Sequence, residues 1–191
     1  MKFALLFLCF LAANAFPQGL SIESQNIKTA YEQLKEHPEV KRVQLRYLHK
    51  FPNNKKQFLR IFNPDNLGQL YSGSYKYISL FIELAKKYPN EVMDKAIRIG
   101  CELKWDADAV GYLQRSIVDL GNEHVKMFSD KLNYLPERQK NGLITFLADV
   151  ENHKAYHDYQ LLIDALTKTN QTKLAEQFIK ARAVREKVKN H

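Results

Sequence analysis

Cysteine is scarce in this chain of 191 residues, which contains only Cys9 and Cys101. Cys9 lies in an N-terminal segment that we expect to be removed, so the mature chain would keep Cys101 alone. A single cysteine excludes an internal disulfide framework, and stability must then come from packing, a bound ligand or an oligomer. We interpret Cys101 as a small buried hydrophobic residue. The alternative is an intermolecular disulfide that joins two copies of the chain in a homodimer.

Long apolar runs are also missing after the first residues of the chain. Lys2 is followed by an apolar stretch over residues 3–11 and then by Ala13-Asn14-Ala15, which has the Ala-x-Ala pattern of a signal-peptide cleavage site. This order is typical of a secretory signal peptide, and the apolar stretch is about half the length of a membrane-spanning helix. We therefore expect a signal peptide over 1–15 and one secreted, extracellular domain over 16–191 without stable membrane insertion.

Several sequence motifs of catalysis and nucleic-acid binding are absent. The chain has no nucleophile elbow, phosphate-binding loop, dinucleotide fingerprint or paired-carboxylate motif. It has no zinc-finger or RNP-type motif either, and secretion disfavours a nucleic-acid partner. We therefore predict a protein that is not an enzyme, holds no cofactor and acts by binding.

Alternating strand patterns bounded by hairpin turns are missing too, and apolar residues recur instead at steps of three and four. Five prolines are each followed by an acid or an asparagine, which favours helix starts. They are Pro38, Pro52, Pro64, Pro89 and Pro136. The pattern predicts an all-α domain of seven or eight amphipathic helices, the first ones short and the later ones long.

Some boundaries follow from individual residues. Asp106 is expected to cap a long helix that contains His124 and continues through Phe128. Residues 66–73 are the expected loop, and Asn141-Gly142 is expected to interrupt the penultimate long helix.

The stretch over residues 47–58 resembles a globin segment in which a proline opens a short helix and a phenylalanine packs on the haem. Pro52 and Phe58 have that spacing. The resemblance implies a globin-like arrangement of the helices as one alternative for the fold. A haem globin also needs a proximal histidine downstream, and no histidine lies between His49 and His124. We therefore do not assign the chain to the globins, and haem binding is a minor alternative.

Aromatic side chains are abundant in the first half, where they indicate either a solid core or an apolar cavity between helices. The cavity interpretation predicts a carrier of a small apolar ligand. Its candidate lining residues are Phe58, Phe62, Tyr77, Phe81, Leu113 and Ile117. Periodicity does not separate a lined cavity from a packed core.

His153 and His157 share one face of a predicted helix and could bind one metal ion. The glutamate of a zinc-protease motif is missing between them, so a closed site would need ligands such as Asp149, Asp158 or His124. A solvated pair of histidines is the plainer interpretation. His124 itself is expected to lie in or beside the core.

The formal net charge is +8, and the C-terminal region from Lys168 to His191 holds seven basic residues against two acids. This excess favours an acidic partner (an extracellular protein or a receptor), an anionic glycan or a membrane surface, while a solvated helix face is the plainer interpretation. A hormone-like signal or interaction factor is therefore the alternative to the carrier, with Lys180, Arg182 and Arg185 as its partner surface. Asn170-Gln171-Thr172 is an N-glycosylation sequon.

Overall fold

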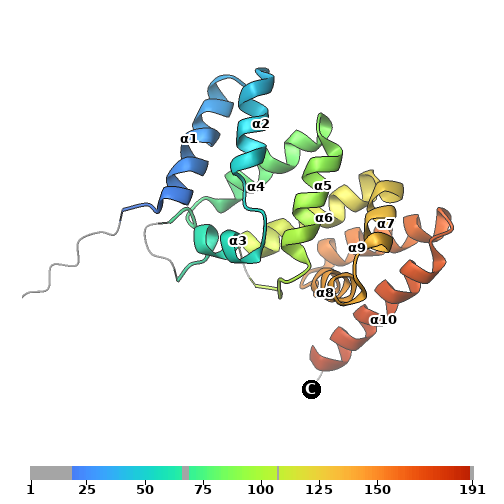
Figure 1. Ribbon diagram of the computed structural model, residues 1–191. Helices are drawn as coiled ribbons and strands as arrows, with labels where there is room; N and C mark the ends of the chain where they lie inside the picture. The colour runs from blue at the N-terminus through green and yellow to red at the C-terminus, as the bar shows by residue number, and fades with distance from the viewer. Residues whose placement is uncertain (1–18, 66–68, 107, 190–191) are drawn as a thin grey trace, which may run out of the picture.

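The computed structural model describes residues 19–65, 69–106 and 108–189 (Figure 1). The predicted signal peptide, residues 1–15, lies outside this part. All regular structure in the described part is helical, as the sequence predicts. The elements are α1 (Ile22–Glu36), α2 (Lys41–Lys50), α3 (Lys55–Phe62), α4 (Ser74–Glu83), the 3₁₀ turn η1 (Leu84–Lys86), α5 (Pro89–Gly100), α6 (Ala109–Glu123), α7 (Val125–Tyr134), α8 (Glu137–Ala148), α9 (His153–Lys168) and α10 (Thr172–Lys189).

Ten α-helices in the described residues replace the seven or eight that we predicted. The expected long helix divides at His124, whose backbone (φ −128°, ψ 48°) leaves the helical region between α6 and α7. The amide of His124 still donates to the carbonyl of Leu120, while its own carbonyl accepts from the amide of Phe128. The backbone groups of His124 therefore stay hydrogen-bonded at the corner. Because the corner residue is neither glycine nor proline, its type does not predict the corner.

The predicted gradient of helix lengths is only partly right, since α1 already has 15 residues. Asp106 does not cap α6, which begins after Asp108. Asn141 and Gly142 lie inside α8 and do not interrupt it. The predicted loop falls partly outside the described residues, and its described part, 69–73, is not helical.

The prolines mark helix starts with one exception. Pro89 is the first residue of α5, and Pro136 directly precedes α8. Pro38 and Pro52 each lie a few residues before a helix. After Pro64 the chain turns instead, because the Asn63 side chain accepts a hydrogen bond from the amide of Asp65 at 2.8 Å.

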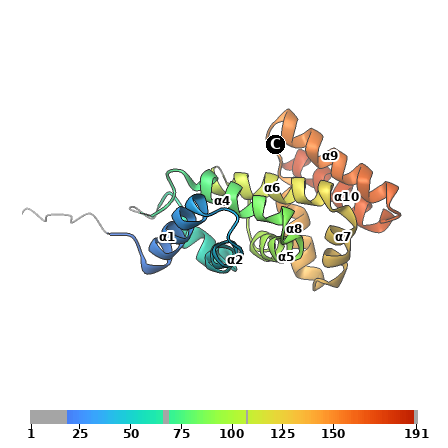
Figure 2. The same cartoon turned by 90° about the horizontal axis from the view of Figure 1, so that it is seen from above.

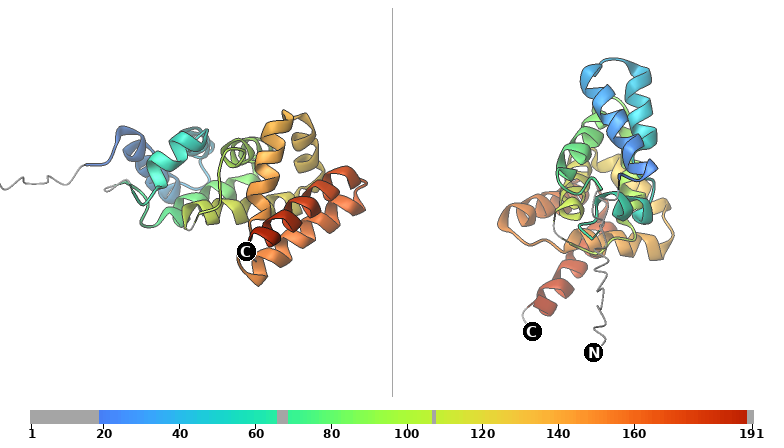
Figure 3. Two further views of the ribbon diagram at one scale, coloured as in Figure 1. Left: turned by 90° about the horizontal axis from the view of Figure 1, so that it is seen from below. Right: turned by 90° about the vertical axis from the view of Figure 1, so that its left-hand side faces the viewer.

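The helices form an elongated molecule (Figures 1 and 2). The α1–α2 hairpin occupies one end and α7–α10 the other, and both views of Figure 3 show this separation. The central helix is α6, which packs against α4, α5, α7, α8 and α9. Its buried residues cover about half of its circumference, including Val110, Leu113, Ile117, Val118 and Leu120.

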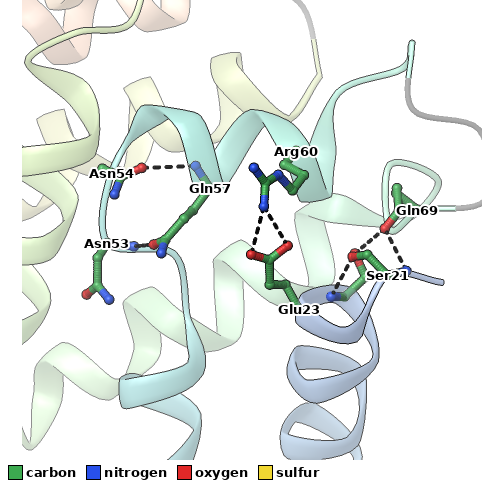
Figure 4. A network of polar contacts seen from close by, with 8 residues as sticks. Ser21, Glu23, Asn53, Asn54, Gln57, Arg60 and Gln69 are labelled. Carbon is green, nitrogen blue, oxygen red and sulfur yellow. Dashed lines mark hydrogen bonds and ion pairs between the residues drawn. The ribbon is translucent and has the colours of Figure 1, made fainter.

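A polar network fastens the start of α1 to α3 and to the chain before α4 (Figure 4). Arg60 donates to both carboxylate oxygens of Glu23, at 2.9 and 3.1 Å. Gln69 accepts from the backbone amide of Ser21 at 3.4 Å. Asn54 caps α3 by accepting from the amide of Gln57 at 3.0 Å. The contacts of Arg60 and Gln69 hold the start of α1 against the rest of the molecule.

Candidate functional site

The six candidate lining residues are found in the core. Phe58, Phe62, Phe81, Leu113 and Ile117 are buried almost completely, and Tyr77 is half-buried.

Four of these residues belong to one aromatic cluster between α2, α3 and α4. Phe58 and Phe62 have ring centroids 5.2 Å apart, and Phe62 and Tyr77 have centroids 6.0 Å apart. Phe81 stacks on Phe51 at 3.9 Å with an interplanar angle of 2°. Rings at these separations contact one another directly. The arrangement therefore has the geometry of a packed core, and none of the six residues lines the surface hollows that follow.

The largest hollow that we identify opens at the surface between α2 and α5 and has a volume of about 680 Å³. Arg46 and His49 from α2 face Lys95 and Arg98 from α5 across it. Leu45, Leu48, Asn53, Glu91 and Asp94 complete its lining.

A second hollow, of about 370 Å³, lies on the other side of α5. It is lined by Asp94, Ile97, Arg98, Lys131, Tyr134, Leu135 and Gln139. Asp94 and Arg98 thus border both hollows, because residues four apart lie on one face of a helix. Figures 1 and 2 show α5 between α2 and α7. We name the two hollows and the ridge of α5 between them the α5 groove.

Lys95 joins the floor of the α5 groove to the end of α2. Its ammonium group donates to the carbonyl oxygens of Leu48 and Phe51, at 2.6 and 2.8 Å. These two carbonyls lie at the negative end of α2, which a cation stabilises. Burial, followed by the charge of Arg98, lowers the pKa of Lys95 to about 8. Lys95 and Arg98 line the same hollow.

Other charges in the α5 groove are already engaged. Lys131 forms an ion pair with Asp94 at 2.6 Å, and Arg46 donates to Gln33 at 2.9 Å. Arg98 is exposed on the ridge of α5, where it borders both hollows. A guanidinium in this position can receive a carboxylate with two parallel hydrogen bonds.

Large apolar side chains are exposed at both sides of the groove. Tyr134, at the end of α7, is 89% exposed, and Leu45 on α2 is 40% exposed. Tyrosine and arginine are enriched among the residues that dominate binding at protein interfaces. The sequence reasoning missed this site. Its residues come from helices far apart in the chain, namely α2, α5, α7 and the start of α8. Its charged residues look like ordinary residues of solvated helix faces.

Of the three histidines singled out from the sequence, His124 and His153 lie at helix boundaries. His153 is the first residue of α9 and His157 lies one turn later, both exposed. His124 forms the corner between α6 and α7, where its side chain is 27% exposed, so its predicted place in a long helix was wrong. Within the described residues, no three metal-ligating side chains come together. A metal site at His153 and His157 stays a prediction.

The predicted partner surface on α10 contains residues with contacts inside the molecule. Arg182 donates to the carbonyls of Ala148 and Val150, at 3.1 and 3.2 Å. Arg185 forms an ion pair with Asp149, which is 5% exposed. Lys180 is exposed. Of the three, Arg182 and Arg185 thus fasten α10 to the segment between α8 and α9.

Cys101 is buried directly after α5. Burial, followed by the charge of Glu102, raises the pKa of its thiol to about 11. An intermolecular disulfide would require Cys101 to become exposed, and the predicted homodimer stays a prediction.

Asn170 lies in the turn between α9 and α10, as the sequence suggests, and is exposed. Its φ of 59° is left-handed. The amides of Asn170 and Gln171 donate to the carbonyls of Thr167 and Leu166, at 3.1 and 2.8 Å. These bonds form a Schellman motif, in which asparagine is tolerated at the left-handed position.

Comparison with known proteins gives no relative: no protein-family model, no curated protein and no solved structure matches the chain. The globin-like arrangement therefore remains a prediction. Among the described helices, none has the length and apolar character needed to cross a membrane.

Proposed function

We propose that the chain is a secreted, non-enzymatic protein that acts by binding another extracellular protein through its folded surface. The observation that supports this proposal is the α5 groove, whose larger hollow, of about 680 Å³, is open and lined by Arg46, His49, Lys95 and Arg98. Cationic and aromatic side chains at an open surface suit recognition of a protein, whereas a small apolar ligand prefers an enclosed, mostly apolar site. A hormone-like signal that a receptor recognises belongs to the same class of function.

The carrier predicted from the sequence remains the competing proposal. It would require the aromatic cluster to open, because the rings of Phe51 and Phe81 now stack on each other at 3.9 Å. Opening a packed core exposes apolar surface and removes favourable contacts between side chains.

Native mass spectrometry on protein secreted from eukaryotic cells tests the proposal. We expect the mass of the processed chain, together with any glycan on Asn170, and no further mass that is lost on denaturation. A stoichiometric apolar compound released on denaturation would contradict surface recognition as the main activity and favour the carrier. A shortened N-terminus beginning at Phe16 in the same spectrum would support secretion.

A further inference from the structure

We propose that the α5 groove binds an acidic, extended segment of the partner protein. Arg98 would receive a carboxylate of that segment on the ridge of α5, while Leu45 and Tyr134 contact apolar side chains on either side. This inference rests on the proposed function and specifies the chemistry of the partner.

The charges of the groove favour an acidic occupant. Asp94 is paired with Lys131 at 2.6 Å, so its charge is already compensated within the protein. The remaining charged side chains of the lining are three cations and one acid: Arg46, Lys95, Arg98 and Glu91. The groove thus carries a local positive excess within a chain that is positive overall. Complementary charge favours encounter with an acidic partner and disfavours a basic one.

The shape of the groove favours an extended segment over a small anion. The two hollows lie on opposite sides of α5, and a helix with its side chains is about 10 Å across. A ligand that enters both hollows must cross that distance, which takes about three or four residues of extended chain. A free phosphate could meet Arg98 but would leave Leu45 and Tyr134 exposed.

The exposed side chains supply the apolar part of the recognition. Tyr134 is 89% exposed and lines the hollow between α5 and α7, and Leu45 lines the hollow between α2 and α5. Apolar residues that flank acidic ones in the partner would cover both side chains. Tyrosine has few rotatable bonds, so fixing it against a partner costs little conformational entropy.

Fluorescence anisotropy with synthetic peptides tests this inference on the full mature protein. The probe is a peptide of about ten residues, long enough to cross α5, in which aspartate, leucine and phenylalanine occupy every second position with serine between them. These side chains then share one face of the extended chain. The control peptide carries asparagine in place of each aspartate. We expect the acidic peptide to bind at least about tenfold more tightly than the control, because it alone can pair with Arg98.

Matched variants locate the binding. Arg98→Glu is expected to weaken binding of the acidic peptide at least about tenfold, since it reverses the central charge. Tyr134→Ala should weaken both peptides. Lys154→Glu makes the same charge change at an exposed position of α9, away from both hollows, and should leave binding unchanged. Circular dichroism on each variant establishes that it is folded, and Arg98 and Tyr134 are exposed enough for their replacement to leave the core intact.

Three results would overturn the inference. They are equal binding of the two peptides, unchanged binding to the Arg98→Glu variant, and displacement of the acidic peptide by inorganic phosphate, which would indicate a small-anion site. A failure here with no released ligand in the native mass spectrum would leave surface recognition in place and move it away from the α5 groove. A released apolar compound would instead contradict the proposed function itself.

Discussion

Gly142 lies where α8 meets the end of α5, and a Cβ atom there would overlap the carbonyl oxygen of Cys101. We expect Gly142→Ala to destabilise the protein by about 1–3 kcal/mol, because the backbone of one helix must move away from the other. Gly111→Ala is the matched control within α6. Its Cβ would lie 3.4 Å from the nearest atom, the carbonyl oxygen of Asp106.

Denaturant unfolding of both variants measures the difference. Removing a helical glycine where space allows should leave stability unchanged or raise it by about 0.5–1 kcal/mol. Equal stability of the Gly142→Ala variant and the parent would contradict the close packing of α5 and α8.

Cys101 makes the stability of the protein depend on pH. Its thiol pKa rises from 9.0 to about 11 on folding, because burial disfavours the thiolate. Between these values the folded chain holds a proton that the unfolded chain has lost. The resulting contribution to the free energy of unfolding is therefore present below pH 9 and disappears as the pH rises through about 11.

Comparison of the parent with Cys101→Ala isolates this effect, since the variant cannot titrate there. We expect the stability of the parent relative to the variant to fall between pH 9 and pH 11. A difference that stays constant over this range would contradict the burial of the thiol.

At the scale of helices, α10 depends on Arg185 for its position. Its guanidinium pairs with Asp149, which is 5% exposed. Arg185→Glu would place two carboxylates together and leave Asp149 without this compensating charge. We expect the free energy of unfolding to fall by at least about 2 kcal/mol. This value is smaller than for a fully buried ion pair because Arg185 is partly exposed.

Lys180→Glu makes the same charge change on the same helix and is exposed. Thermal unfolding should show no more than a small change for this control. Equal effects of the two substitutions would mean that Arg185 does not fasten α10.

The turn between α9 and α10 carries the glycosylation sequon. Asn170 is exposed there, and Thr172 is the first residue of α10. In protein secreted from eukaryotic cells we expect a glycan on Asn170 that peptide N-glycosidase removes. Thr172→Ala should abolish the glycan, while Thr172→Ser should keep it, because only the hydroxyl is required. A mass without glycan in the parent would contradict this prediction.

Sequence periodicity was sufficient for the helical class, since most apolar stripes became buried helix faces, such as Val92, Ala96 and Ile97 on α5. It was insufficient at His124, because a helix corner without glycine or proline leaves no local signal. The prediction that Asn141-Gly142 interrupts a helix was wrong because a single glycine has more than one structural role. A glycine can end a helix or admit a neighbouring one, and only the contact with Cys101 decides between these roles.

For the whole molecule, the sequence indicates which residues are apolar or basic better than it indicates where a binding site lies. Five of the six candidate lining residues are buried and Tyr77 is half-buried, but the sequence pattern does not distinguish a lined cavity from the packed rings of Phe51 and Phe81. The α5 groove was beyond prediction from the sequence because α2, α5 and α7 meet only through the tertiary fold. Basic residues on α10 stood out as a charge run, yet Arg182 and Arg185 are engaged within the molecule.

Nuclear magnetic resonance mapping of the bound acidic peptide tests the central claim, recognition at the α5 groove, most directly. Amide shifts in the mature, isotope-labelled protein would be followed as the peptide is added. We predict that the largest changes fall on residues that line the groove, including Leu45, Asp94, Arg98 and Tyr134. Changes concentrated at Phe58, Phe62 and Phe81, or on α10 alone, would contradict the claim.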